Sequence, residues 1–266
     1  VPRTWTLSGM VRDITVTPDG DVWFAVMGSA GGVLHFDGQR FEEFGTADGI
    51  GNHGASSLAI DREGALWVGT GHHATGRGVL RFDRDRLVSY TWADGIGEVY
   101  DLGEDGNGHL WLAGRRTLTR FDGEHFASLQ LVPESQGGPV TLAIDGQNRV
   151  WIPALSHGWH SGLRGYDGTS VRQVDRTQNT NYTEVMADDG AARWRGQGFA
   201  QSRVEAPFDS LSARNRLVRN VLTTTDGTLW AGAFFGGVYG FRGDEEVRLT
   251  QRNGLADDHV TRLFED

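Results

Sequence analysis

Apolar and polar residues alternate over short stretches of the chain, and the clearest stretch runs from Asp61 to Thr70, DREGALWVGT. A turn containing acidic residues and a glycine is followed there by an apolar run that carries Trp67. Period-two alternation bounded by such turns predicts β-strands joined by hairpins. The same phrase returns around five further tryptophans: Trp23, Trp111, Trp151, Trp194 and Trp230. Successive tryptophans are 44, 44, 40, 43 and 36 residues apart, so the chain is built from repeats.

Each repeat predicts four strands. In the first repeat they fall at residues 11–17, 22–26, 32–38 and 40–46, with an Asp-Gly hairpin between the third and the fourth. Comparable sets follow in the other repeats, and the fifth repeat, around Trp194, is the most degraded. A repeat of this size cannot bury its own apolar face, so the repeats must stack on one another. Four-stranded repeats at this period predict an all-β fold, a β-propeller in which each repeat is a blade.

The pattern predicts a propeller but leaves two alternatives for the number of blades. Six complete motifs predict a six-bladed propeller. The last residues, 253–266, read NGLADDHVTRLFED and match the start of another repeat, so a seventh, incomplete blade is the alternative. In either case we expect one propeller domain over residues 1–266, with the motif tryptophans filling the wedges between blades.

The repeat resembles the two-component regulator propeller repeat. The clearest matches are ADGIGNHGASSLAIDREGALWVGT (47–70) and NGLADDHVTRLFED (253–266). The resemblance implies a propeller of the kind that forms the extracytoplasmic sensing part of hybrid histidine kinases. The chain departs from that pattern because no kinase, receiver, membrane span or immunoglobulin-like module accompanies the repeats.

Composition narrows the classes of function. The chain has a net charge of −10 and no cysteine. Nucleic-acid binding needs a basic surface, so we expect no nucleic-acid partner. Without cysteine there are no disulfides or thiolate metal ligands. No apolar run long enough to span a membrane is present. No signal peptide is visible, so we expect a periplasmic or extracellular protein if a leader has been removed and a cytoplasmic one otherwise.

One polar row recurs in the first strands of the repeats. Alignment on the tryptophans places six residues at one position: Asp13, Ser57, Asp101, Thr141, Glu184 and Asn220. The next position is apolar in every repeat, so strand alternation predicts that the polar row faces the central channel. Carboxylates in a narrow ring repel one another unless a cation or protons compensate them, and oxygen ligands suit Ca²⁺ or Mg²⁺. The alternative is that the row holds ordered water.

Histidines form the second candidate cluster. Most of them fall in the loops expected at the channel mouth, namely His53, His72, His73, His157, His160 and His259. His73 and His157 are equivalent, since each follows its motif tryptophan by six residues. Imidazoles converging from separate loops suit Zn²⁺ or another transition metal, and histidine is a common general base. The alternative for each histidine is a surface loop position, and His259 matches the repeat consensus.

These rows define the predicted site. We expect a divalent metal ion, Zn²⁺, Ca²⁺ or Mn²⁺, with ligands among His53, His73, His157, Glu184, His72, His160, Asp13 and Asp101. The catalytic residues would be His53, Glu184 and Asp101. A substrate pocket would be walled by Trp159, Tyr100, Tyr182, Phe234, Phe235 and Asn220, or these aromatic residues pack at the rim.

The sequence is consistent with two alternative functions. A weaker, architectural resemblance links the acidic row to gluconolactonase and diisopropylfluorophosphatase, propeller hydrolases with a divalent metal at the channel mouth. It implies a metal-dependent hydrolase acting on an ester, lactone or phosphotriester. The repeat resemblance instead implies a sensor propeller that binds a small molecule or glycan without chemistry. The partner is a small molecule in both cases, and the oligomeric state is open.

Overall fold

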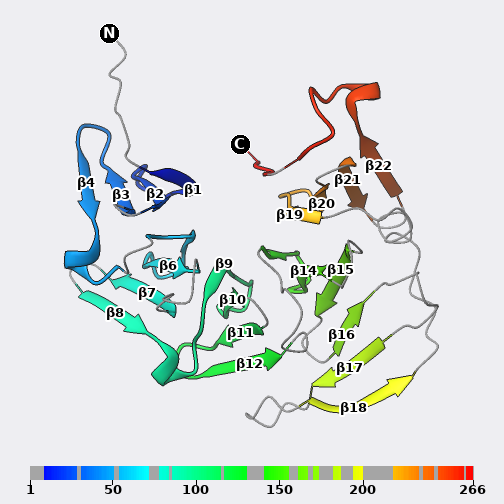
Figure 1. The fold of residues 1–266 in the computed structure, drawn as a ribbon, viewed down its shortest axis with the longest axis horizontal. Helices are drawn as coiled ribbons and strands as arrows, with labels where there is room; N and C mark the ends of the chain where they lie inside the picture. Colours follow the sequence, from blue (N-terminus) through cyan, green and yellow to red (C-terminus); the bar gives the residue numbers. More distant parts are fainter. Residues whose placement is uncertain are drawn as a thin grey trace. The chain divides into compact units, whose positions relative to one another are not determined.

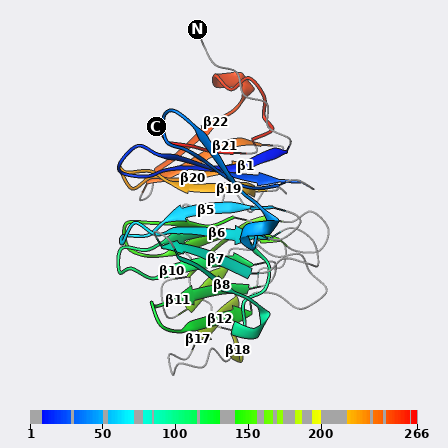
Figure 2. The same ribbon diagram turned by 90° about the vertical axis from the view of Figure 1, so that its left-hand side faces the viewer.

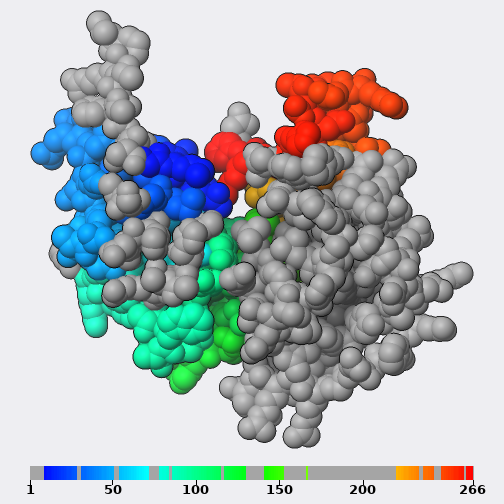
Figure 3. Space-filling model, in the orientation of Figure 1, coloured from blue at the N-terminus to red at the C-terminus, as the bar shows by residue number. Residues whose placement is uncertain are grey.

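The structure is a computed structural model. It describes residues 9–28, 31–50, 54–71, 78–83, 86–114, 117–130, 141–155, 161–166, 170–173, 182–186, 194–199, 218–233, 236–242, 245–260 and 262–265. The residues coloured in Figure 3 belong to this set, and their colour follows their position in the chain. The described residues fold almost entirely into antiparallel β-sheets (Figure 1), which confirms the all-β prediction.

The first three repeats each form a four-stranded sheet whose strands follow one another in chain order. Sheet one contains β1 (Met10–Val16), β2 (Val22–Met27), β3 (Gly32–Phe36) and β4 (Phe41–Phe44). Sheet two contains β5 (Ser57–Ile60), β6 (Leu66–Thr70), β7 (Gly78–Asp83) and β8 (Arg86–Tyr90), which lie side by side in Figure 2. Sheet three contains β9 (Val99–Glu104), β10 (Leu110–Gly114), β11 (Thr117–Phe121) and β12 (Phe126–Gln130).

The sixth repeat also forms its own four-stranded sheet, sheet five. Its strands are β19 (Val218–Thr223), β20 (Leu229–Ala233), β21 (Gly237–Arg242) and β22 (Glu245–Leu249). Four of the six repeats therefore fold as the four-stranded blades that the alternation predicts.

The fourth and fifth repeats differ from the prediction. They share sheet four, which has six strands: β13 (Ala143–Ile144), β14 (Val150–Leu155), β15 (Ser161–Tyr166), β16 (Ser170–Gln173), β17 (Tyr182–Met186) and β18 (Trp194–Phe199). The described strands make five sheets, and those of the fifth repeat continue sheet four. The third and fourth strands expected in this repeat lie outside the described residues, so the number of blades stays a prediction.

The sequence supplies a physical reason. One residue after the motif tryptophan, four of the other five repeats bury an aliphatic side chain almost completely: Val68, Leu112, Ile152 and Ala231. The fifth repeat has Arg195 at this position. An arginine cannot replace a buried aliphatic side chain between two stacked sheets without an uncompensated charge.

Three short 3-10 turns follow the fourth strands of sheets one, two and five. They are η1 (Thr46–Asp48), η2 (Trp92–Asp94) and η4 (Gln251–Asn253). In each turn an Asp or Asn side chain accepts a hydrogen bond from the backbone N–H of the capping residue, three positions earlier. In η2 and η4 the cap is reciprocal, because the hydroxyls of Thr91 and Thr250 accept a backbone N–H in return. The cap fixes the path of the chain where it leaves the fourth strand.

Contact density divides the chain into two compact units. Unit 1 comprises Val1–Glu104, Leu110–Arg115 and Arg120–Phe126, and unit 2 comprises Asp105–His109, Arg116–Thr119 and Ala127–Asp266. The boundary passes through sheet three. The expectation of a single domain over residues 1–266 stays a prediction.

Within unit 1, each sheet packs on the next one through the face that carries its motif tryptophan. The face of sheet one that carries Trp23, Ala25 and Val33 packs against Leu58 and Val68 of sheet two. The tryptophan face of sheet two packs in turn on sheet three, where Trp67 and Val79 contact a cluster that includes Leu102, Leu110, Leu112 and Phe121. Trp67 is only 2% exposed. The motif tryptophans of these two sheets therefore lie between sheets, as predicted.

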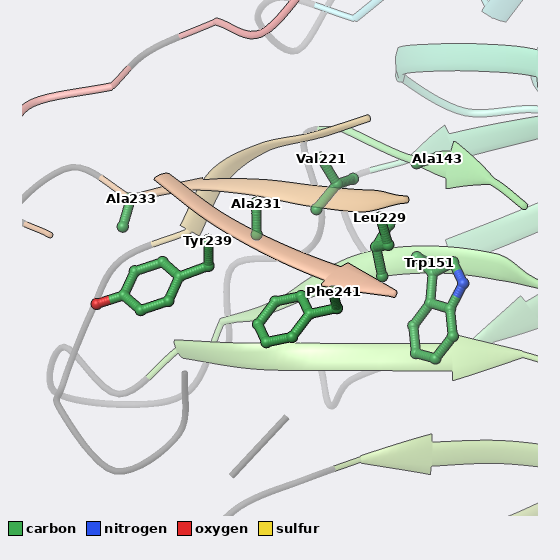
Figure 4. Packing of buried hydrophobic residues seen from close by; sticks show 8 residues of the cluster. All are labelled: Ala143, Trp151, Val221, Leu229, Ala231, Ala233, Tyr239 and Phe241. Carbon is green, nitrogen blue, oxygen red and sulfur yellow. The ribbon is translucent and has the colours of Figure 1, made fainter. Parts of the chain in front are cut away.

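Unit 2 repeats the arrangement. Figure 4 shows the cluster in which Ala143 and Trp151 of sheet four lie close to Val221, Leu229 and Phe241 of sheet five. Sheet five therefore packs directly on the first two strands of sheet four. In the part of the chain that the structure describes, no helix is long and apolar enough to cross a membrane.

Candidate functional site

The polar row lies on the first strands of the sheets, where the alignment puts it. Asp13 is in β1, Ser57 in β5, Asp101 in β9 and Asn220 in β19. The apolar position that follows the row is buried in sheets two, three and five, at Leu58, Leu102 and Val221. The two rows therefore have the separate environments that strand alternation requires.

Asp13 links sheet one to sheet two. Its Oδ2 atom accepts a 2.9 Å hydrogen bond from the backbone N–H of Leu58, and its Oδ1 atom accepts one of 3.0 Å from the N–H of Ile14. Leu58 directly follows the row position of sheet two. The Asp13 carboxylate thus holds two neighbouring first strands together.

Asn220 makes the same link in unit 2. Its Oδ1 atom accepts a 2.8 Å hydrogen bond from the backbone N–H of Leu263, 43 residues later. Its Nδ2 atom lies 3.4 Å from Oγ1 of Thr141, another member of the row. Asn220 was predicted to lie at a substrate pocket, and the structure shows it buried and hydrogen-bonded in the packing of the first strands.

Asp101 and Tyr100 lie next to each other on β9 in unit 1. Oδ1 of Asp101 accepts a 3.0 Å hydrogen bond from the N–H of Leu102. The hydroxyl of Tyr100 donates a 3.0 Å hydrogen bond to Oε2 of Glu98. Ser57, on the neighbouring strand β5, is 1% exposed, and its hydroxyl has no hydrogen-bond partner within the described residues.

The fifth-repeat candidates are not on a first strand. Tyr182 and Glu184 lie in β17, which pairs with β16 on one side and β18 on the other. In this register Glu184 is opposite Val171 and Gln197. The alignment with the first strands fails at this repeat because its strands continue sheet four.

Most loop candidates lie outside the described residues. These are His53, His72, His73, His157, His160, Trp159, Phe234 and Phe235. Within the described residues, no three His, Asp or Glu side chains come close enough together to hold a metal ion. The predicted divalent metal site therefore stays a prediction that depends on these loops.

The described end of one such loop, at Gly71, lies beside β9, whereas Gly54, at the end of another, lies beside Val26 of β2. Ser57 pairs with Gly69, so β5 begins and β6 ends on the same side of sheet two, where the loops connect its strands. Gly71 packs so closely on β9 that an added Cβ atom would lie 2.3 Å from the carbonyl oxygen of Val99 and 2.9 Å from Cα of Tyr100. His72 directly follows Gly71 in the sequence, and His53 directly precedes Gly54.

The remaining described histidines have structural partners. His35 stacks on Trp23 with ring centroids 4.2 Å apart, and its Nε2 atom is 2.7 Å from Oδ2 of Asp21. His109 is hydrogen-bonded to Asp105, and His259 to Asp257. These histidines contact carboxylates within or next to hairpins, where they support the turn geometry.

Sequence reasoning missed Trp92. This residue opens the turn η2 and is 68% exposed, although a tryptophan usually buries most of its surface. Its ring lies over Gly97, where an added Cβ atom would be 2.7 Å from Cη2 of the indole. The equivalent positions of the other two turns carry Thr46 and Gln251. A tryptophan at a position that is polar in the related turns is the signal that would have found it.

Comparisons with known proteins give the fold. No protein-family model matches the chain, and no curated protein sequence matches it. Among solved structures, a catalytically inactive variant of virginiamycin B lyase from Staphylococcus aureus, crystallised with quinupristin, has a TM-score of 0.57. The alignment covers 91% of this chain and 70% of the lyase at 13% identity.

Two further structures match both resemblances expected from the sequence. The extracellular domain of the two-component system BT4673 from B. thetaiotaomicron matches with a TM-score of 0.48 at 14% identity, over 97% of this chain and 36% of that one. A protein classed as a gluconolactonase matches with a TM-score of 0.49 at 14% identity, over 91% of this chain and 79% of that one. At such identities the likeness concerns the fold. The likeness to the lyase, together with the stacked four-stranded sheets, shows that this chain is a β-propeller.

Proposed function

We propose that this chain is a ligand-binding propeller module whose site lies in unit 1, around Trp92, Glu98 and Tyr100. The observation that carries the proposal is the exposure of Trp92. Burying an indole stabilises a fold by roughly 2–3 kcal/mol, so an indole left in solvent at a fixed turn suits stacking against a ligand.

The neighbouring polar groups supply directional contacts. The Glu98 carboxylate accepts from the Tyr100 hydroxyl at 3.0 Å and retains further acceptor capacity. The Trp92 ring lies over Gly97, the residue before Glu98, and an apolar ring together with a carboxylate fits a small ring compound that carries hydroxyl or amino groups. A sugar or a cyclic amine has this combination.

The polar row supports a binding scaffold. The side-chain oxygen of Asp13 accepts the backbone N–H of Leu58 in the next first strand, and that of Asn220 accepts the N–H of Leu263 in the C-terminal segment. These side chains hold the sheets in place, and loops on a rigid scaffold then provide the ligand contacts.

A thermal-unfolding screen tests the proposal. Wild-type protein would be heated with a panel of monosaccharides, oligosaccharides, amino acids and cyclic amines, and each hit would be checked for chemical change. We expect at least one compound to stabilise the protein, by about 2.7 kcal/mol at a concentration 100-fold above its Kd, and to be recovered unchanged.

The decisive variant is Trp92→Thr, which installs the residue type found at Thr46. We expect it to weaken binding at least ~10-fold, in the range of an aromatic stacking contact. Gln251→Ala is the matched control, because it changes the equivalent position of the turn in unit 2. Equal affinity of Trp92→Thr and wild type for the ligand would refute the proposed site. Chemical conversion of the ligand would refute the proposal that the protein binds without catalysis.

The second candidate is a metal-dependent hydrolase of esters, lactones or phosphotriesters. The position of Gly71 favours it, because the loop that contains His72 and His73 begins beside Tyr100 and β9. His53, His73 and His157, with Glu184, would hold the ion, and Asp101 would act as a base. A bound divalent ion would polarise the reacting carbonyl or phosphoryl group.

Elemental analysis of dialysed protein separates the two candidates. The hydrolase candidate predicts about one equivalent of Zn²⁺, Ca²⁺ or Mn²⁺ per chain and turnover of an ester, lactone or phosphotriester. If His53→Ala and His157→Ala both leave the metal content and the turnover unchanged, this candidate fails.

A further inference from the structure

Arginine side chains lie on the faces of two motif tryptophans in this structure. In unit 1, Cζ of Arg81 is 5.5 Å from the centre of the Trp67 ring, and its Nη2 atom is 3.4 Å from Oδ2 of Asp61. In unit 2, Cζ of Arg149 is 5.2 Å from the centre of the Trp151 ring, and its Nε atom is 2.7 Å from the carboxylate that accepts the indole N–H. Each guanidinium is therefore held by an indole face and by a carboxylate at the same time.

Trp92 differs from these tryptophans because it is 68% exposed. The six-membered half of its indole rests on the backbone, since an added Cβ atom at Gly97 would lie 2.7 Å from Cη2, 3.0 Å from Cζ3 and 3.3 Å from Cζ2. Within the described residues, no arginine and no aromatic ring stacks on Trp92. The ring is thus held in place by Gly97, and its exposed surface is available to a ligand.

Two carboxylates belong to the same segment. Asp94 is an exposed residue of the turn η2, and Glu98 directly follows Gly97. Oδ2 of Asp94 accepts the N–H of Thr91 at 2.8 Å, and Oε2 of Glu98 accepts the hydroxyl of Tyr100 at 3.0 Å. Both carboxylates retain acceptor capacity, because each has a second oxygen. The segment therefore has the indole and the carboxylate of the arrangement around the motif tryptophans, without the guanidinium.

The local charge favours a cationic ligand. Residues 87–114 contain no arginine or lysine, and the whole chain has a net charge of −10. Carboxylates attract a cation without direct contact, because salt screens charges only over ~8 Å at physiological ionic strength. The related turn η4 differs, since it carries Gln251 and Asn253 on either side of Arg252. Among the three described turns, an exposed indole and an acidic segment coincide in η2.

We propose that the ligand of this site is a guanidinium compound, whose planar cation stacks on Trp92 and is attracted by Asp94 and Glu98. The inference rests on the proposed function and narrows it to one class of ligand. A guanidinium group is planar, always charged and able to stack on an aromatic face, whereas an ammonium group is a compact and strongly hydrated charge. A neutral sugar would use the indole but would gain nothing from the charge of the two carboxylates.

Two matched ligands test the charge directly. N-acetylarginine N-methylamide presents a guanidinium group without charged ends, and the corresponding citrulline compound has an uncharged urea group of nearly the same shape. Calorimetric titration of the intact chain with each compound gives the two affinities. Free arginine is the third probe. Tighter binding of free arginine than of the capped compound would support a free small molecule as the ligand, and the reverse would support an arginine side chain of a peptide.

We expect the capped arginine to bind at least ~5-fold more tightly than the citrulline compound, the size of a cation–π contact. Added salt should weaken the binding of the arginine compound and leave that of the citrulline compound nearly unchanged. Trp92→Thr should weaken the binding of the arginine compound by at least ~10-fold, because the aromatic face is lost.

Charge-neutral variants test the two carboxylates. Glu98→Gln and Asp94→Asn remove a charge but keep an oxygen acceptor, and Asn253 already makes the equivalent capping bond in η4. Each variant should lower the affinity for the arginine compound by about 2- to 5-fold and leave that for the citrulline compound unchanged. Asp48→Asn is the matched control, because it makes the same change of charge in the cap of η1 and should alter neither affinity.

The results separate this inference from the proposed function. Equal affinities for the arginine and citrulline compounds would overturn the inference, and so would equal effects of Asp48→Asn and Asp94→Asn. Trp92-dependent binding of a neutral sugar, with no binding of the arginine compounds at millimolar concentration, would overturn it and leave the proposed function intact. If no compound of either kind loses affinity in Trp92→Thr, the proposed site fails together with the inference.

Discussion

The indole N–H of Trp151 donates a 2.9 Å hydrogen bond to Oδ2 of Asp145, six residues earlier in the chain. Trp67 makes the same bond to Asp61 at 2.8 Å. In both cases the acidic residue opens the hairpin turn before the second strand, and its other oxygen accepts turn N–H groups. One carboxylate thus fixes the turn and orients the tryptophan that packs between sheets.

Asp145→Ala should destabilise the protein strongly. The substitution leaves the buried Trp151 indole without its acceptor, and it removes the partner of Arg149, whose side chain is 2.7 Å from Asp145 and 43% exposed. We expect a loss of about 1–3 kcal/mol in the free energy of unfolding, mostly from the unsatisfied indole N–H, measured by urea denaturation. Glu63→Ala is the control, because Glu63 forms a surface ion pair and should change stability by about 0–1 kcal/mol. A similar loss in both variants would contradict the assigned role.

The same carboxylate should make stability depend on pH. Burial by itself would raise the pKa of Asp145, but hydrogen bonds from Trp151 and Arg149 outweigh it and hold the pKa below its usual value. A folded-state pKa below that of the unfolded chain stabilises the fold above the unfolded value, about 3.9. This stabilisation is lost as the pH falls through the folded-state pKa.

Asp145→Asn isolates this contribution from the other carboxylates. Its deficit in unfolding free energy relative to wild type should be largest at neutral pH, should shrink below about pH 4, where Asp145 becomes protonated in the unfolded wild-type chain, and should be smallest once the pH has fallen through the lower folded-state pKa. Urea denaturation of both proteins between pH 7 and pH 3 measures the difference. A deficit that stays constant across this range would show that the charge of Asp145 is not involved.

Substitutions of Asp13 distinguish a structural role of the polar row from a metal-binding role. Asp13→Asn keeps an oxygen that can accept from the N–H of Leu58, whereas Asp13→Ala removes it. We expect Asp13→Ala to lose about 1–2 kcal/mol of unfolding free energy and Asp13→Asn to lose less than half of that. Equal losses, together with a loss of bound metal in both variants, would favour a ligand role instead.

The strands were predictable because alternation and turn chemistry are local signals. The first repeat predicts strands at 22–26 and 40–46, and the structure has β2 at Val22–Met27 and β4 at Phe41–Phe44. The fifth repeat has the tryptophan and the turn residues of the motif, yet its described strands continue sheet four. It carries Arg195 where sheets two to five bury an aliphatic residue, and such a difference in packing is not visible in the turn chemistry.

The site was harder to predict than the fold. Parity along a strand shows on which face Asp13 lies, but it does not show that the carboxylate meets a backbone N–H 45 residues away. That partner depends on how two sheets stack. Only His73 and His157 among the loop histidines share a repeat position, so the convergence of the whole set cannot be derived from spacing.

Alanine substitutions at Gly78 and Gly64 distinguish the stability cost of a steric conflict from that of backbone strain. Both have positive φ, 95° and 84°. An added Cβ atom at Gly78 would lie 2.0 Å from the carbonyl oxygen of Tyr90, whereas nothing lies within 4 Å at Gly64. Gly64→Ala should cost about 1 kcal/mol from strain alone, and Gly78→Ala should cost several times more or prevent folding. Thermal denaturation would measure both, and equal costs would rule out the close contact of the strands at Gly78.

Asp226, in the turn between β19 and β20, should have one of the lowest side-chain pKa values in the described part of the chain. The hydroxyl of Thr224 donates to its Oδ1 atom at 2.7 Å and the N–H of Thr228 does so at 3.0 Å, which lowers the pKa to about 2. Arg242, 3.2 Å from Oδ2, adds a smaller effect. Thr224→Val removes the strongest of these contacts with little change in shape, so the pKa should rise towards its usual value, and by more than in Arg242→Gln. Carbon NMR of the carboxyl group during a pH titration measures both shifts. A larger rise in Arg242→Gln would show that the ion pair, rather than the turn hydrogen bonds, controls this carboxylate.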